Sequence, residues 1–134
     1  MRICTAVLVA VVTLAASAAH AGVVAVDPAT KADRPVNWRW AAKPDAFKMA
    51  LIMSTVSRHD AHVGDVGRVE CVIGELRRPV DCRTLSEPPG SRLAAATARL
   101  AYYYKAPARD EDGKSPVGRT VRVSFTLTAP GGFE

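Results

Sequence analysis

Two neighbouring segments, residues 68–74 and 79–85, constrain the fold more than any other part of the chain. Both are rich in apolar and β-branched residues, and a short connection around Leu76 and Arg77 separates them, which is the pattern of a β-hairpin. A turn centred between those two residues fixes the register of the strands. Because side chains alternate between the faces of a sheet, a slip of one residue would turn one strand's side chains to the wrong face.

This register brings matching side chains together on each face of the hairpin. The two cysteines face each other with aliphatic residues beside them, and a glutamate faces an arginine on the other face. An opposite-charge pair in this position stabilises an antiparallel ladder by about 0.2–1 kcal/mol. The facing pairs are Val69 and Thr84, Glu70 and Arg83, Cys71 and Cys82, and Ile73 and Val80.

Residues 1–21 have the pattern of a secretory signal peptide. Arg2 supplies the positive charge, residues 3–16 form an apolar run, and a small-x-small motif ends at Ala21. We therefore expect export, cleavage after Ala21, and no stable membrane span in the mature protein. The alternative is an inner-membrane protein held by an uncleaved N-terminal segment. A membrane-spanning helix, however, needs about 20 predominantly apolar residues, and this run is shorter.

Cleavage would remove Cys4 and leave Cys71 and Cys82 as an even pair. In an oxidising compartment such a pair is usually a disulfide. Facing residues of antiparallel strands have Cα atoms about 4.5–5.5 Å apart, a span that a disulfide bridges. We therefore predict a Cys71–Cys82 disulfide within the hairpin. A redox centre would favour C-x-x-C spacing, which the sequence lacks.

The basic excess of the chain is mild and scattered. Lysine and arginine total 18 against 13 acidic residues, and these charges do not gather in runs. A solvated surface accounts for them, so we expect no nucleic-acid partner.

Residues 22–44 are expected to form an irregular N-terminal arm, because prolines interrupt them at three places. Trp38 and Trp40 lie in this arm, and two interpretations of them stay open. They tie the arm onto the core, which is the commoner role, or they form a binding patch.

Residues 45–56 fit both a helix and a buried strand, and the helix is the preferred interpretation. Asp45 is suited to cap the start of such a helix. Apolar residues recur at helical spacing, but they also alternate. The helical stripe comprises Phe47, Ala50, Leu51 and Ser54, and the alternating set comprises Met49, Leu51 and Met53.

The sequence predicts a second helix over residues 91–104, with Ser91 as its N-cap after a Pro-Pro-Gly sequence. Its many alanines favour helix and let it lie close to a sheet. Arg92 and Arg99 are expected to point away from the apolar stripe. That stripe comprises Leu93, Thr97, Leu100 and Tyr104, with Ala96 and Tyr103 beside it.

A last strand is predicted over residues 117–128, where apolar and polar residues alternate. Such alternation is typical of a sheet with one covered and one solvated face. The covered set comprises Val121, Val123, Phe125 and Leu127, and the solvated set comprises Thr120, Arg122, Ser124 and Thr126.

Together these segments predict an α+β fold in the order helix–strand–strand–helix–strand. The three-stranded antiparallel sheet would have one face covered by a helix, with the first strand central because the second helix crosses over it. Pro79 then lies on an edge strand, where its missing N–H is tolerated, and the last strand forms the other edge. The expected boundaries are a signal peptide over 1–21, an arm over 22–44 and the domain over 45–134.

The segment from Ser57 to His62 is the one local candidate for a catalytic or metal site. Its two histidines and aspartate could ligate zinc, or Ser57 could act as a nucleophile. No further ligand of recognisable spacing follows, so an exposed loop is the preferred interpretation. The acidic turn at residues 110–112 lacks the spaced ligands of a calcium loop. We therefore expect no catalytic residues, no metal, no cofactor and no enzyme.

Residues 67–125 resemble the C-terminal domain of TonB-type energy transducers. The order and spacing of several short motifs carry the resemblance, and the paired cysteines resemble a subgroup in which these two strands are bridged. The motifs are Gly67-Arg-Val-Glu-Cys71, Val80-Asp-Cys82, Glu87-Pro-Pro-Gly90, an alanine-rich helix ending at Tyr104, Pro107, Asp112-Gly113, Pro116-Val117 and Val121-Arg-Val-Ser-Phe125.

The resemblance implies a periplasmic binding module that takes part in TonB-dependent transport across the outer membrane. In that family an extended segment of an outer-membrane receptor adds as a strand to the exposed edge of the last strand, and backbone groups carry most of the affinity. Arg119 and Arg122 would meet an acidic or polar partner. The edge here comprises Arg119, Thr120, Val121, Arg122, Val123, Ser124, Phe125 and Thr126.

Several features depart from full transducers. The chain has a cleavable-looking signal peptide in place of a membrane helix, and it has no long Pro-rich spacer. It is therefore not expected to pull mechanically between two membranes. The tight-turn glycine of the first hairpin is also missing, since Arg77 stands near that place. The alternative function is a self-associating structural or assembly protein of the cell envelope, a possible homodimer that uses the same edge strand.

Overall fold

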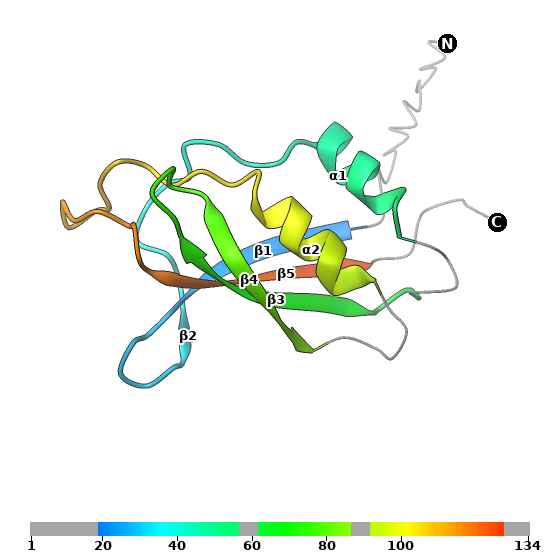
Figure 1. The fold of residues 1–134 in the computed structure, drawn as a ribbon, viewed down its shortest axis with the longest axis horizontal. Helices are drawn as coiled ribbons and strands as arrows, with labels where there is room; N and C mark the ends of the chain where they lie inside the picture. Colours follow the sequence, from blue (N-terminus) through cyan, green and yellow to red (C-terminus); the bar gives the residue numbers. More distant parts are fainter. Residues whose placement is uncertain (1–18, 57–61, 87–91, 128–134) are drawn as a thin grey trace, which may run out of the picture.

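The computed structural model describes residues 19–56, 62–86 and 92–127. They form an α+β fold in which a five-stranded antiparallel sheet carries two helices on one face (Figure 1). The elements are β1 (Ala19–Val26), β2 (Asp33–Arg34), α1 (Ala46–Met53), β3 (Val66–Ile73), β4 (Pro79–Ser86), α2 (Leu93–Ala101) and β5 (Thr120–Leu127).

The strand order is β2-β1-β5-β3-β4. Two expectations about this sheet are confirmed: β3 lies between its hairpin partner β4 and the last strand β5, and Pro79 belongs to the edge strand β4. The expected number of three strands is wrong. β1 and β2 extend the sheet beyond β5, so the segment expected to be an irregular arm supplies strand structure.

β1 pairs with β5 along almost its whole length, from Ala19 opposite Leu127 to Ala25 opposite Val121. β5 is therefore an interior strand, and the expectation that it forms an exposed edge is wrong. The physical reason is the cost of leaving a row of backbone N–H and C=O groups without partners, which a neighbouring strand removes. β1 begins within the expected signal peptide. The sequence analysis excludes those residues from the fold, so it does not predict this strand.

The β3–β4 hairpin has the predicted register at two pairs, and it is shifted by one residue before them, where Arg68 lies opposite Ser86. Val69 lies opposite Thr84, and Glu70 lies opposite Arg83. Beyond the cysteines the register shifts by one residue, so Ile73 lies opposite Pro79 and not opposite Val80 as predicted.

A β-bulge on β4 causes this shift. Asp81 has φ 53°, and Asp81 and Cys82 together occupy the space opposite Cys71. An extra residue of this kind displaces all later pairs of the ladder. The turn also differs from ordinary backbone geometry, because Arg77 takes φ 62° at the place where the resemblance expects a glycine.

Residues 45–56 contain a helix, which confirms the preferred interpretation. Asp45 caps α1, its carboxylate accepting the Lys48 N–H at 2.7 Å. The residues that gave the helical spacing face solvent, with Phe47 75% and Leu51 55% exposed. Ile52 packs into the core, against α2 and β5, and Met49 packs against the same cluster.

The second helix is shorter than predicted and ends at Ala101. After the helix, Lys105 pairs with Ala42 of the N-terminal arm. Ser91, the expected N-cap, lies outside the described residues. The predicted stripe is confirmed, since its members are all buried: Leu93, Thr97, Leu100 and Tyr104.

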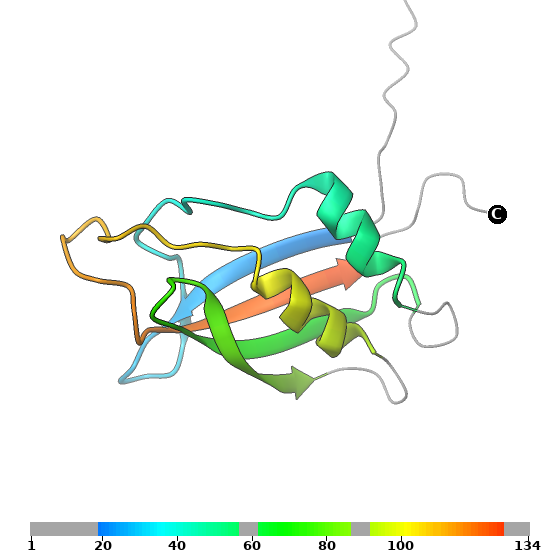
Figure 2. The same cartoon turned by 45° about the horizontal axis from the view of Figure 1, so that its top comes forward.

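Close contact between α2 and β3 depends on a glycine. A Cβ at Gly67 would lie 2.5 Å from Thr97 Oγ1 and 2.8 Å from the Leu93 carbonyl oxygen. Only glycine lets the helix backbone approach a strand so closely. This contact places α2 across the inner face of the sheet (Figure 2).

Candidate partner-binding strand

β5 has the side-chain alternation that the sequence predicts. Its apolar residues point to the helix-covered face and are buried, while its polar residues on the other face are half-buried. The buried set is Val121, Val123, Phe125 and Leu127, and the half-buried set is Thr120, Arg122, Ser124 and Thr126.

The backbone hydrogen bonds show to which neighbouring strand the N–H and C=O groups of each β5 residue are bonded. The Leu127 N–H donates to the Asp65 carbonyl at 3.0 Å, and the Arg119 carbonyl accepts the Ile73 N–H at 2.9 Å. Both bonds run toward β3. Because backbone groups of successive residues point to opposite edges of a strand, odd-numbered residues of β5 bond to β3 and even-numbered ones point to β1.

The even-numbered residues are therefore the ones whose backbone groups β1 satisfies. The register places Arg122 opposite Val24, Ser124 opposite Gly22 and Thr126 opposite His20. The edge predicted to receive a partner is thus occupied by a strand of the same chain.

Arg122 is held on the open face by two carboxylates. Its guanidinium donates to Asp33 Oδ1 at 2.7 Å and to Glu70 Oε2 at 3.1 Å. The hydrogen bond to Asp33, followed by that to Glu70, raises the pKa of Arg122 above its ordinary value. Asp33 belongs to β2, so the N-terminal hairpin itself supplies an acidic partner of the kind predicted for this arginine.

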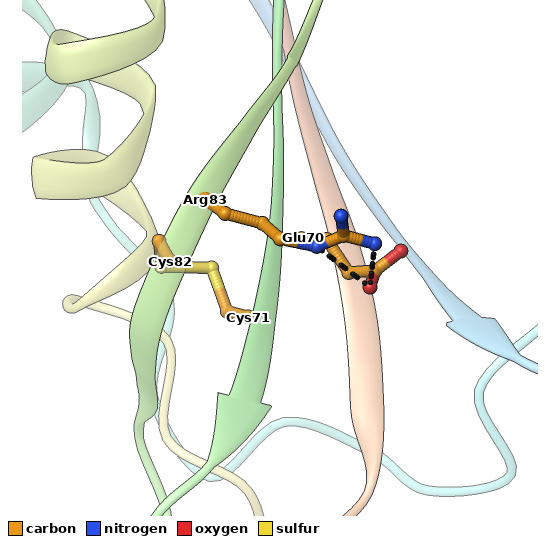
Figure 3. Close-up of a disulfide and its surroundings, with 4 residues drawn as sticks. All are labelled: Glu70, Cys71, Cys82 and Arg83. Carbon is orange, nitrogen blue, oxygen red and sulfur yellow. Dashed lines mark hydrogen bonds and ion pairs between the residues drawn. A yellow bond between two sulfur atoms is a disulfide. The ribbon is translucent and has the colours of Figure 1, made fainter.

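Glu70 of β3 bonds to an arginine on each of the two neighbouring strands on the open face of the sheet. It accepts hydrogen bonds from Arg83 at 2.7 Å and from Arg122. The hydrogen bond from Arg83 is the main cause that lowers the pKa of Glu70. Figure 3 shows this pair extending from the hairpin on the side opposite the disulfide. The predicted cross-strand ion pair is confirmed.

Arg119 does not face an open partner site. It donates to Asn37 Oδ1 at 2.8 Å and to the Asp110 carboxylate, and its guanidinium lies 5.6 Å from the centre of a Trp38 ring. Arg119 therefore fastens the N-terminal arm to the turn that precedes β5.

Asp110 is the buried acid at the centre of this connection. Burial acts to raise the pKa of its carboxyl. Hydrogen bonds from the Lys114 and Asp112 backbone N–H groups and from Arg119 outweigh burial, so the pKa is lower than its ordinary value. Nothing in the sequence pattern indicates this role, because an aspartate at this position also fits a solvated acidic turn.

The two tryptophans pack against the core, as the commoner of the two interpretations expected. Trp38 is 5% exposed and belongs to the main core cluster. Trp40 makes edge contacts with Trp38 and with Tyr104, at ring separations of 5.4 and 5.1 Å. Burial raises the pKa of Tyr104. These contacts hold the chain that links β2 to α1.

The predicted disulfide between Cys71 and Cys82 is present, with a Cα–Cα distance of 4.1 Å (Figure 3). Cys71 is fully buried in the core and Cys82 packs beside it. The bridge fixes β4 to β3 on the inner face of the sheet, and therefore supports β5 from the side opposite β1.

A small hollow of about 200 Å³ lies on the open face where β1, β3 and β5 meet. Val24, Arg68, Arg122 and Ser124 line it together with Asp33. A larger hollow of about 780 Å³ lies toward β2, and all four of its guanidinium groups are paired with carboxylates, including Glu70.

The Ser57–His62 segment lies outside the described residues except for His62, whose N–H donates to Asp65 Oδ2 at 2.7 Å. In the three described stretches, no group of three histidine, cysteine or acidic side chains is placed to hold a metal ion. No helix within these stretches is long and apolar enough to cross a membrane. The expectations of no metal and no catalytic site stay predictions.

A scan against protein-family models finds no match, and searches of curated proteins and of solved structures find none either.

Proposed function

We propose that this protein is an exported TonB-like binding module that takes up an extended protein segment, such as one from a TonB-dependent outer-membrane receptor, along the β1 side of β5. The pairing of β1 with β5 carries the proposal. It supports the idea that this side of β5 accepts an extended segment, because a strand from outside residues 67–125 already occupies it. Affinity at such a site comes chiefly from main-chain hydrogen bonds.

Processing would shape this site. Cleavage after Ala21 would remove Ala19, His20 and Ala21, which supply three of the seven paired positions of β1. The backbone groups of Thr126 would then lose their partner, and the end of β5 would be open to a second segment. Mass spectrometry of the exported protein tests this step, because an N-terminus at Gly22 is expected and an intact N-terminal segment would contradict it.

The alternative function is self-association through the same strand. β1 lies at one end of the described chain, and residues 35–41, which belong to no strand or helix, connect its hairpin to the rest of the fold. Exchange of β1 between two copies would form the same ladder in trans, which is a common route to dimers. A concentration-dependent mass in solution would favour this alternative.

The experiment that tests the proposed function is a titration of the folded protein with peptides copied from the N-terminal segments of outer-membrane receptors. We expect saturable binding that shifts the backbone NMR signals of Arg122, Ser124 and Thr126 most. The matched control is each peptide with one proline substituted at its centre, which removes a ladder hydrogen bond and should weaken binding. Equal binding of both peptides, or shifts confined to β4, would contradict strand addition at β5.

A further inference from the structure

We propose that β1 is a built-in competitor for the β5 edge, and that a partner segment displaces it by carrying an acidic residue at the place of Val24. This inference rests on the proposed function and concerns the regulation and specificity of the same site. It follows from how the side chains of β1 fit the inner and open faces of the sheet.

On the inner face, the residues of β1 are small and complete the core. Ala25 is 7% exposed, and Val23 and Ala21 pack against the two core clusters. They lie opposite residues of β5 whose side chains are fully buried, such as Val123 and Phe125. A segment that replaces β1 must therefore carry small aliphatic side chains at these alternate positions.

On the open face, the described side chains of β1 leave space beside Gly22 and make no polar contact with the arginines near Val24. A Cβ at Gly22 would meet only Ser124 Oγ, at 3.6 Å, so a larger side chain fits there. Val24 points an apolar side chain toward the hollow that Arg68 and Arg122 line. Within the described part of the chain, the exposed guanidinium of Arg68 has no ion-pair partner.

A carboxylate at the place of Val24 would meet both guanidinium groups. Opposite charges on directly facing residues stabilise antiparallel strands, and Val24 faces Arg122. Because Arg122 is already paired with Asp33 and Glu70, the interaction that such a partner gains over β1 is chiefly the one with Arg68, while the backbone hydrogen bonds to β5 stay the same. Strand exchange is then favoured only for a partner of this class, and other extended segments are kept out by β1.

The test uses the full chain with two synthetic peptides. One copies residues 19–26, and the other carries Glu in place of Val24. Residue-resolved amide exchange reports on both strands. We expect the Glu peptide to bind about tenfold more tightly, to release the Gly22 and Val24 amides of β1, and to leave the Arg122, Ser124 and Thr126 amides protected.

Three variants sharpen the test. Val24→Pro removes an N–H that points to β5, so both peptides should bind about tenfold more tightly, whereas Val24→Ala keeps this N–H and should change the affinities much less. Arg68→Gln should remove the advantage of the Glu peptide without changing the affinity of the copied peptide. Protection of the β3–β4 amides confirms that each variant is folded.

Several outcomes would overturn the inference. Binding of the Glu peptide while the β1 amides stay protected would show that β1 is not displaced. Equal affinities of the two peptides would remove the role of the arginine pair. If receptor peptides bind to β5 in either case, the proposed function stands and only the competitor role fails. If neither receptor peptides nor these two peptides bind, both fail.

Discussion

Val23 of β1 lies opposite Val123 of β5, in the middle of the ladder that fills the edge expected to receive a partner. Val123 is fully buried, and Val23 packs against the same core cluster. The side chains of β1 therefore complete the core while its backbone completes the sheet. Opening the candidate binding strand must expose apolar surface as well as break hydrogen bonds, and a partner has to replace both.

Gly67→Ala should destabilise the fold by about 1–3 kcal/mol, because its Cβ would overlap Thr97 and the Leu93 carbonyl. Gly22→Ala is the matched control, since its Cβ would meet only an ordinary contact at 3.6 Å. Urea unfolding of the two variants measures the difference. A Gly67 variant as stable as the control would mean that α2 does not lie as close to β3 as described.

Ile52→Ala should cost about 2–5 kcal/mol, because Ile52 is 2% exposed and packs against α2 and β5. Phe47→Ala should change stability by less than about 0.5 kcal/mol, because Phe47 is 75% exposed on the same helix. The pair distinguishes the observed orientation of α1 from the one that the sequence pattern predicts. The reverse order of the two effects would support the predicted orientation.

Replacing both cysteines, Cys71 and Cys82, by alanine should destabilise the protein by about 3 kcal/mol. Closing the short loop between them restricts the unfolded chain by about that amount. Thermal unfolding of the variant, compared with the oxidised protein, measures the loss. Alkylation of unreduced protein provides the check on the bond itself, because a free thiol at either position would contradict a formed bridge.

Asp110→Asn should lower the melting temperature at neutral pH and have little effect in acid. The folded-state pKa of Asp110 is lower than its ordinary value of 3.8, so its stabilising contribution is present above that value and is lost as the pH falls through the folded-state pKa. Melting temperatures between about pH 7 and pH 2 measure the difference. Glu111→Gln, on the exposed part of the same turn, is the control. A difference that persists at the lowest pH would contradict the assignment.

The sequence pattern predicts most of the inner layer correctly, because alternation on β5 and helical spacing on α2 report directly which side chains are covered. The sequence pattern fails where the same residues are compatible with two orientations of an element. Phe47 and Leu51 have helical spacing, but Ile52 and Met49 pack inward, because α1 contacts α2 along a different side. The bulge at Asp81 has no signal in the sequence, since positive φ values occur there without a glycine.

The sequence predicts part of the candidate site. It predicts which side chains of β5 are covered, but it does not predict that β1 pairs with β5 on the side away from β3. Residues 19–26 are mostly small and aliphatic, a composition that fits both the end of a signal peptide and a β-strand. Only their pairing with β5 shows that they form a strand. Arg122 was expected to need an acidic partner, and the distant Asp33 supplies it over 89 residues of separation.

The most direct test of the account is amide hydrogen exchange of the protein without any peptide, resolved along β5. If β1 occupies the edge, the even-numbered amides of Arg122 and Ser124 should be protected to a similar extent as the odd-numbered amides of Val123 and Phe125, which bond to β3. Fast exchange at the even-numbered positions alone would show that the edge of β5 is open, and would contradict both the pairing with β1 and its role as a competitor.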